Sequence, residues 1–201
     1  MIKYNNGKSY SPKEIKKKED KKTVSLKRHL SSANRGMDLE EDINASNEYY
    51  KEKGLCLITK RPTPINIVKV DYSKGAIITN AYFEKQSTTD YNGVYKGHYI
   101  DFEAKQTKSK SSFPLANIPS QQIDHLKRVL AQKGIAFFII EFVALGKTFL
   151  LDASYVIEFY EHGERKSIPY SKFLEVAHEI KRGFAPRLDY LPIVEKIYCK
   201  N

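Results

Sequence analysis

The order of helical and extended segments predicts one layered domain that mixes α-helices and β-strands, of the α/β or α+β class. Residues 115–133 carry apolar side chains every three or four positions, which is the spacing of one helix face. Residues 135–143 are a nearly continuous apolar run rich in Phe and Ile, typical of a strand buried on both faces. Residues 94–104 are strand-like.

The remaining elements follow from the same periodicities. Helices are expected at residues 36–53 and 170–180, and short strands at residues 55–59 and 148–151. Ser120 is a good N-cap for the helix within 115–133. Residues 65–70 and 76–83 are predicted to pair as a hairpin with a basic tip, in a segment that spans about 60–83. Pro62 and Pro64 keep the approach to this hairpin out of a central strand.

Composition excludes several classes of protein. The chain has 201 residues, a hydrophobic fraction of 41% and a net charge of +10, so it has enough apolar material for a buried core. No apolar run approaches the roughly 20 residues of a membrane-spanning helix. The lysine-rich N-terminus lacks the apolar core of a secretory signal. Cys56 and Cys199 are too few for a disulfide framework or a zinc site, so a reducing cytoplasmic location is expected.

The positive charge is concentrated at the N-terminus. Residues 1–30 hold ten Lys or Arg and three acids, whereas the other 171 residues hold 24 and 21. We therefore divide the chain into a basic, poorly ordered arm at 1–30 and a folded domain at 31–201. The arm either contacts the phosphates of a nucleic acid or is a solvated tail without a role, and the charge alone does not decide between them.

Three charged side chains alternate along the strand-like segment. Residues two apart on a strand share a face, so Asp101, Glu103 and Lys105 should point one way, opposite to Phe102 and Ala104. Two carboxylates and a lysine are costly to desolvate on one face unless they share a ligand such as a metal ion. A surface strand with a salt bridge is the simpler alternative.

A third carboxylate, that of Asp90, is brought to this face if Lys96 and Gly97 form the centre of a reverse turn. Paired residues then have numbers that sum to 193, so Asp90 lies opposite Glu103, with Cβ atoms about 5 Å apart. That separation suits one or two hard divalent cations. A bulge at Asn92 and Gly93 would break this register.

The spacing Asp, twelve residues, Glu-x-Lys resembles the PD-(D/E)xK nuclease superfamily. Seven blocks, in family order and at family spacing, are similar to the RecU family of Holliday junction resolvases. They are residues 34–37 (NRGM), 60–64 (KRPTP), 87–93 (STTDYNG), 99–105 (YIDFEAK), 112–115 (SFPL), 122–125 (QIDH) and 183–190 (GFAPRLDY). The resemblance runs from about residue 31 to near the C-terminus. It implies an α/β fold with a mixed central β-sheet flanked by helices, a restriction-endonuclease-like core, and a protruding stalk hairpin near 60–83.

The resemblance also implies the roles of single residues. Family members associate magnesium with positions that correspond here to Thr88, Asp90, Glu103 and Gln122, and Lys105 would stabilise the transition state. Asp90, Glu103 and Lys105 are thus the candidate catalytic residues. Mg²⁺ is the expected cofactor and Mn²⁺ a substitute. An oxygen-rich set of this kind is what Mg²⁺ prefers.

DNA contacts are expected from five basic residues. If residues 60–83 form the family's stalk, Lys60, Arg61, Lys69 and Lys74 would reach the centre of a junction, and Arg35 would bind a phosphate before the first helix. The alternative is a solvated sheet edge that lysines and prolines protect from pairing.

Other polar residues have open roles. Asp101 is either an acid that supports the site or a surface charge. His125 lies one turn from Gln122 and either touches DNA or is simply packed. Glu40 and Glu41 either feed the active site or stabilise the dipole of the first helix.

The resemblance implies a Mg²⁺-dependent, structure-selective endonuclease that cuts four-way DNA junctions by paired symmetric nicks in recombination and repair. It also implies a homodimer, because a two-fold substrate needs two symmetric cuts. A recombinase is a candidate partner, and no membrane contact is expected. One alternative is a non-catalytic junction-binding protein that remodels DNA or recruits recombination partners. Another is a nuclease of the same superfamily with a duplex substrate.

Overall fold

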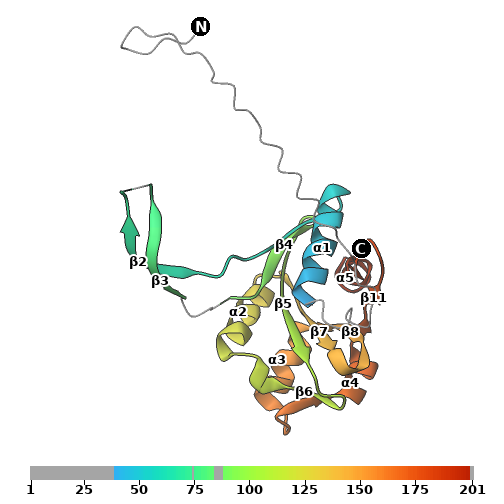
Figure 1. Ribbon diagram of the computed structural model, residues 1–201. Helices are drawn as coiled ribbons and strands as arrows, with labels where there is room; N and C mark the ends of the chain where they lie inside the picture. Colours follow the sequence, from blue (N-terminus) through green and yellow to red (C-terminus); the bar gives the residue numbers. More distant parts are fainter. Residues whose placement is uncertain (1–38, 74, 84–87, 200–201) are drawn as a thin grey trace, which may run out of the picture. The chain divides into compact units, whose positions relative to one another are not determined.

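A six-stranded mixed sheet lies at the centre of the protein in the computed structural model, which describes residues 39–73, 75–83 and 88–199 (Figure 1). The strands lie in the order β1-β4-β5-β7-β8-β10, with β5 and β7 parallel and the other neighbours antiparallel. Their bounds are β1 Leu57–Lys60, β4 Tyr91–Tyr95, β5 His98–Thr107, β7 Ile135–Phe142, β8 Lys147–Asp152 and β10 His178–Glu179. The predicted mixed central sheet is confirmed.

Helices cover both faces of this sheet. Every residue of β7 is buried, with Phe137 and Ile139 in one core cluster and Phe138 and Ile140 in the other, as strand alternation requires. The first cluster contains residues of α1 (Leu39–Glu52) and α5 (Leu191–Tyr198). The second contains residues of α2 (Ser120–Ala131), α3 (Ala153–His162) and α4 (Tyr170–Val176). The prediction that 135–143 is a strand buried on both faces is confirmed.

The predicted register between β4 and β5 is correct. Tyr95 pairs with His98 and Tyr91 with Phe102, so each pair sums to 193. Lys96 and Gly97 have φ values of 47° and 82°, which is the left-handed backbone of a tight two-residue hairpin turn. The single strand expected at 94–104 is therefore interrupted at this turn, and no bulge breaks the pairing at Asn92 and Gly93.

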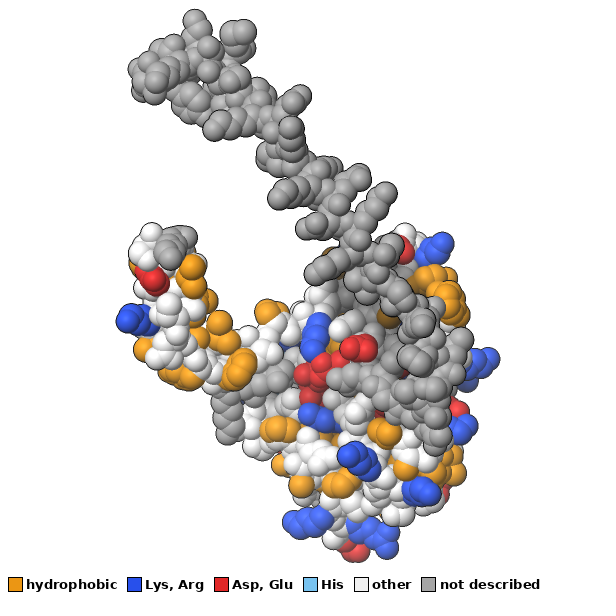
Figure 2. Space-filling view, in the orientation of Figure 1, with side chains coloured by type: hydrophobic (Ala, Val, Ile, Leu, Met, Phe, Trp, Pro, Cys, Tyr) orange, Lys and Arg blue, Asp and Glu red, His pale blue; other side chains and the backbone are white. Residues whose placement is uncertain are grey.

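The predicted hairpin is present. β2 (Ile65–Asp71) and β3 (Ile77–Phe83) form their own two-stranded antiparallel sheet. Its apolar side chains are largely exposed, at 53% for Ile67, 60% for Tyr82 and 78% for Phe83 (Figure 2). A two-stranded sheet alone in water is marginally stable, so this exposed apolar surface calls for a covering partner.

Short elements complete the chain. They are β6 (Ser112–Pro114) paired with β9 (Ser167–Pro169), β11 (Lys181–Arg182) paired with β12 (Leu188–Asp189), and 3-10 turns at Leu115–Asn117 and Val143–Leu145. No helix in the described part of the chain is long and apolar enough to cross a membrane.

Two expectations about helices are wrong. Ser120 is the first helical residue rather than the N-cap, because the extended backbone at Pro119 ends the preceding segment. The helix expected at 170–180 ends at Val176, since residues 178 and 179 pair with β8 as strand β10. Two further helices, α3 and α5, were not predicted.

Candidate active site

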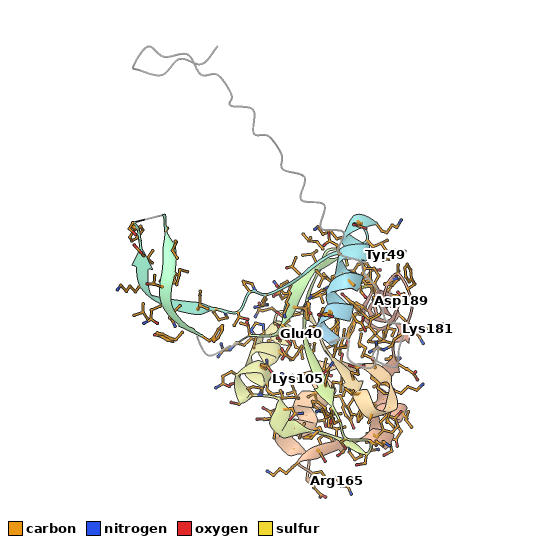
Figure 3. All side chains as sticks on the ribbon, in the orientation of Figure 1. Glu40, Tyr49, Lys105, Arg165, Lys181 and Asp189 are labelled. Atoms are coloured by element: carbon orange, nitrogen blue, oxygen red, sulfur yellow. The ribbon has the colours of Figure 1, made fainter. Side chains whose placement is uncertain are left out.

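The charged face of β5 is buried rather than solvated. Asp101 and Glu103 are 0% and 1% exposed, and Lys105 is partly buried beside them. Helix α2 packs on this face and Gln122, in its first turn, reaches Glu103. Figure 2 shows acidic and basic side chains gathered together in this region, and Figure 3 labels Lys105 there. The alternative of a surface strand with a salt bridge does not fit this burial.

Glu103 is the centre of a compact set of contacts. Its Oε1 accepts hydrogen bonds from Lys105 Nζ at 2.5 Å and from Gln122 Nε2 at 2.7 Å. Its Oε2 accepts one from the backbone N–H of Asp90 at 3.0 Å, and Asp90 Oδ2 accepts one from the backbone N–H of Ala104 at 3.3 Å. The structure therefore brings four of the five predicted site residues together: Asp90, Glu103, Lys105 and Gln122. Asp90 reaches Glu103 because of the pairing register between β4 and β5.

The electrostatics of Glu103 reflect this crowding. Burial raises its pKa to about 7, the nearby Asp90 carboxylate adds to the rise, and the Lys105 ammonium opposes it. A carboxylate pair held close together out of water is costly unless a cation joins it.

One buried atom beside Glu103 lacks a hydrogen-bond partner. Gln122 Oε1 is buried and has no hydrogen-bond partner, although the other end of the same amide is bound to Glu103. An orphaned amide oxygen on a side chain that contacts the Glu103 carboxylate matches the all-oxygen preference of Mg²⁺, which also keeps several waters. Among the described residues, no cluster of three or more His, Cys, Asp or Glu side chains is placed to hold a metal. Thr88, half-buried, precedes Asp90 by two positions.

Asp101 supports the site from the same strand face. Its Oδ2 accepts from an Arg61 guanidinium nitrogen at 2.5 Å, the Tyr99 hydroxyl at 2.7 Å and His125 Nε2 at 3.0 Å, while its Oδ1 accepts from the Thr89 hydroxyl. Burial by itself raises the pKa of Asp101, but the hydrogen bonds from His125, Thr89 and Tyr99 and the charge of Arg61 hold it below its usual value. The surface-charge alternative for Asp101 is wrong.

The basic residues expected to contact DNA lie in different settings. Lys60, at the end of β1, pairs with Glu40 of α1, and Arg61 is held against Asp101 and the Tyr99 hydroxyl. Lys69 lies exposed on β2. Arg35 and Lys74 lie outside the described residues, as does the arm at 1–30.

Three residues of the Asp101 network were not predicted to belong to the site. Thr89 lies within the family-like block at residues 87–93, and Tyr99 shares the face of Asp101 by strand alternation. The sequence therefore contained information that could have identified both. His125 was left open, and its contact depends on how α2 docks on β5, which no local pattern reveals.

The chain was also compared with known proteins. A family model described as "Recombination protein U" matches residues 34–196. The chain is 49% identical over 207 residues to the Holliday junction resolvase RecU of Geobacillus sp. (strain WCH70), covering 100% of both chains. It is 47% identical over 203 residues to the RecU of Bacillus subtilis (strain 168), covering 98% of this chain and 96% of that one.

Among solved structures, a weak likeness is found to Archaeoglobus fulgidus Hjc, a Holliday junction resolvase from an archaeal hyperthermophile. Its TM-score is 0.39 at 11% identity, over 66% of this chain and 90% of that chain. The sequence relationships, by contrast, extend over almost the whole chain. The protein belongs to the RecU family.

Proposed function

We propose that this protein is a Mg²⁺-dependent endonuclease that cuts four-way DNA junctions by paired, symmetric nicks. The observation that carries the proposal is the arrangement around Glu103, where two neighbouring carboxylates and the orphaned Gln122 Oε1 lie beside Lys105. The relatives of this chain are named Holliday junction resolvases, which supports the junction as substrate.

Asp90, Glu103 and Gln122 would hold the cation, with Thr88 as a further oxygen donor, as the family resemblance implies. When bound, Mg²⁺ supplies Lewis-acid polarisation of a phosphate and lowers the pKa of a water. Mn²⁺ has similar oxygen-ligand chemistry and is the expected substitute.

Lys105 provides the positive charge for the transition state. Its ammonium lies 2.5 Å from Glu103 Oε1, on the strand face that carries the acids. As the attacked phosphate gains negative charge on its non-bridging oxygens, this ammonium stabilises it, and the surrounding burial strengthens the interaction.

Asp101 would keep the donor set in place. It ties Thr89, which precedes Asp90, and Arg61, which precedes the hairpin, to the strand that carries Glu103. Since the site elements are fixed before substrate arrives, little reorganisation is needed during the reaction.

We further propose that the protein acts as a homodimer. Two symmetric cuts in a two-fold substrate match a two-fold enzyme. The exposed apolar side chains of the β2–β3 hairpin are a further surface that a partner could cover. The candidate contacts to junction DNA remain the same five basic residues: Arg35, Lys60, Arg61, Lys69 and Lys74.

A cleavage assay tests the proposal. End-labelled mobile four-way junction is incubated with the protein beside linear duplex of the same sequence, each with Mg²⁺ and with EDTA. We expect symmetric nicks confined to the junction and abolished by EDTA. Tight junction binding without a cut would favour a non-catalytic remodelling protein, and duplex cleavage would indicate a different nuclease substrate.

A further inference from the structure

A hollow that includes three residues without a role so far, Gln121, Asp124 and Arg128, lies on the exposed side of α2. Its volume is about 270 Å³, and it is lined by Thr88, Gln121, Asp124, His125 and Arg128. The four α2 residues are spaced i, i+3, i+4 and i+7, so they form one stripe along the helix. This stripe lies beside the one that carries Gln122, whose side chain is buried against Glu103.

His125, which lines this hollow, contacts Asp101. Its Nε2 lies 3.0 Å from Asp101 Oδ2, and Asp101 is itself fixed by Arg61, Tyr99 and Thr89. An ionised carboxylate only accepts hydrogen bonds, so Nε2 carries the hydrogen. The ring is thereby oriented as part of the lining of the hollow.

The polar groups of the hollow match the backbone of a nucleic acid. Arg128 offers a guanidinium and Gln121 an amide N–H₂ group, which are common donors to phosphate oxygens. Asp124 is the opposing charge, and it is exposed at helical spacing from Arg128. It would weaken the binding of an anion without blocking it.

The hollow also lies next to the metal donors. Thr88, one of its lining residues, is two positions from Asp90, and Gln121 adjoins Gln122. A DNA strand with one phosphate at Glu103 and Lys105 must place its neighbouring phosphates close by. We propose that the hollow is a subsite for a phosphodiester next to the one that is cut, held by Arg128 and Gln121. This inference rests on the proposed nuclease function.

Two substitutions, one that removes a positive charge and one that removes a negative charge, test the subsite. Junction binding is measured in EDTA, which prevents cutting, across a salt series. Arg128→Gln should weaken binding about tenfold at low salt and reduce the slope of log K against log salt by about one. Asp124→Asn should tighten binding about threefold, because it removes a charge that repels phosphate. Arg165→Gln, the same change at an exposed arginine away from Lys105 (Figure 3), should leave both values unchanged.

A chemical probe then locates the phosphate. Junctions carrying a single neutral methylphosphonate at successive positions around the cut site are bound to the wild type, to Arg128→Gln and to Gln121→Ala. On the junction whose modified phosphate is the one that the subsite binds, both variants should bind as tightly as the wild type, and this position should be adjacent to the cut. The melting temperatures of both variants should be close to that of the wild type. Unchanged affinity and salt slope in Arg128→Gln, or weaker binding in Asp124→Asn, would overturn the subsite. If the wild type still cuts junctions in Mg²⁺, the proposed function survives that result.

Discussion

At Glu103, burial and charge act in opposite directions on the same carboxyl group. Removal from water and the adjacent Asp90 favour the protonated form, while Lys105 favours the ionised form, and the pKa settles at about 7. A cation between the two acids would remove this conflict, because it favours the ionised form of both. The ionised form of Glu103 is therefore disfavoured without a metal, and a cation bound there would stabilise it.

The pH dependence of metal binding follows from this pKa. Below pH 7 a proton competes with the cation for Glu103, so the affinity for Mg²⁺ should fall about tenfold between pH 8 and pH 6. Calorimetric titration of the metal-free protein with Mg²⁺ at the two pH values measures this. Glu175→Gln, an exposed acid on α4, should behave as the wild type. Equal affinity at both pH values would show that Glu103 is not a ligand.

Removal of either acid should separate binding from cleavage. Asp90→Asn and Glu103→Gln keep the size of each side chain but remove a metal donor, so we expect cleavage to fall by at least about a hundredfold. Junction affinity in EDTA should stay within about threefold of the wild type, because the phosphate contacts remain. Loss of folding together with binding in both variants would mean that the acids are structural.

Sequence patterns predicted much of this site but not its support. Strand alternation placed Asp101, Glu103 and Lys105 on one face, and the turn at Lys96 and Gly97 set the register that brings Asp90 to Glu103. Both rules are local. Whether Asp101 would be exposed or buried depended on α2 and on Arg61, which is 40 positions away in the chain. No local pattern contains that packing.

At the scale of elements, the contact between β1 and β4 is unusually close. A Cβ on Gly93 would lie 2.0 Å from the carbonyl oxygen of Leu57 and 2.6 Å from Ile58 Cα, both backbone atoms that cannot move aside cheaply. The close approach keeps β1 paired, and β1 leads directly to Lys60 and Arg61.

Gly93→Ala should therefore lower the free energy of unfolding by about 3 kcal/mol or more, through overpacking. Gly146→Ala is the comparison: Gly146 has φ +61° with open space around it, so only the left-handed backbone costs energy, about 1 to 2 kcal/mol. Denaturant unfolding measures both. A smaller effect at Gly93 than at Gly146 would contradict the close strand contact.

The C-terminal helices show where periodicity fails. Residues 170–180 carry an apolar spacing that suits a helix, but the last residues instead pair with β8, where the backbone groups of the sheet edge are satisfied. The missed α3 begins with an Asp152 cap, whose side chain accepts from the Ser154 N–H. That cap is a sequence signal, but it lies at the end of a strand and is easily taken for a turn.

For the whole molecule, the uneven charge gives a test of the arm. Residues 1–30 carry seven of the ten surplus positive charges. If they contact phosphates, deletion of 1–30 should weaken junction binding most at low salt and make the salt dependence shallower. Binding measured across a salt series decides this. An identical slope in the truncated and full-length proteins would show that the arm does not contact DNA.

The position of a bound ion decides whether Asp90, Glu103 and Gln122 form one metal centre. Crystals of the protein soaked in Mn²⁺ and measured for anomalous scattering would locate it. We expect an anomalous peak within about 2.5 Å of both carboxylates and of Gln122 Oε1. A Mn²⁺ peak elsewhere, or none at this site at a concentration that supports junction cleavage, would show that these three residues are not the metal ligands.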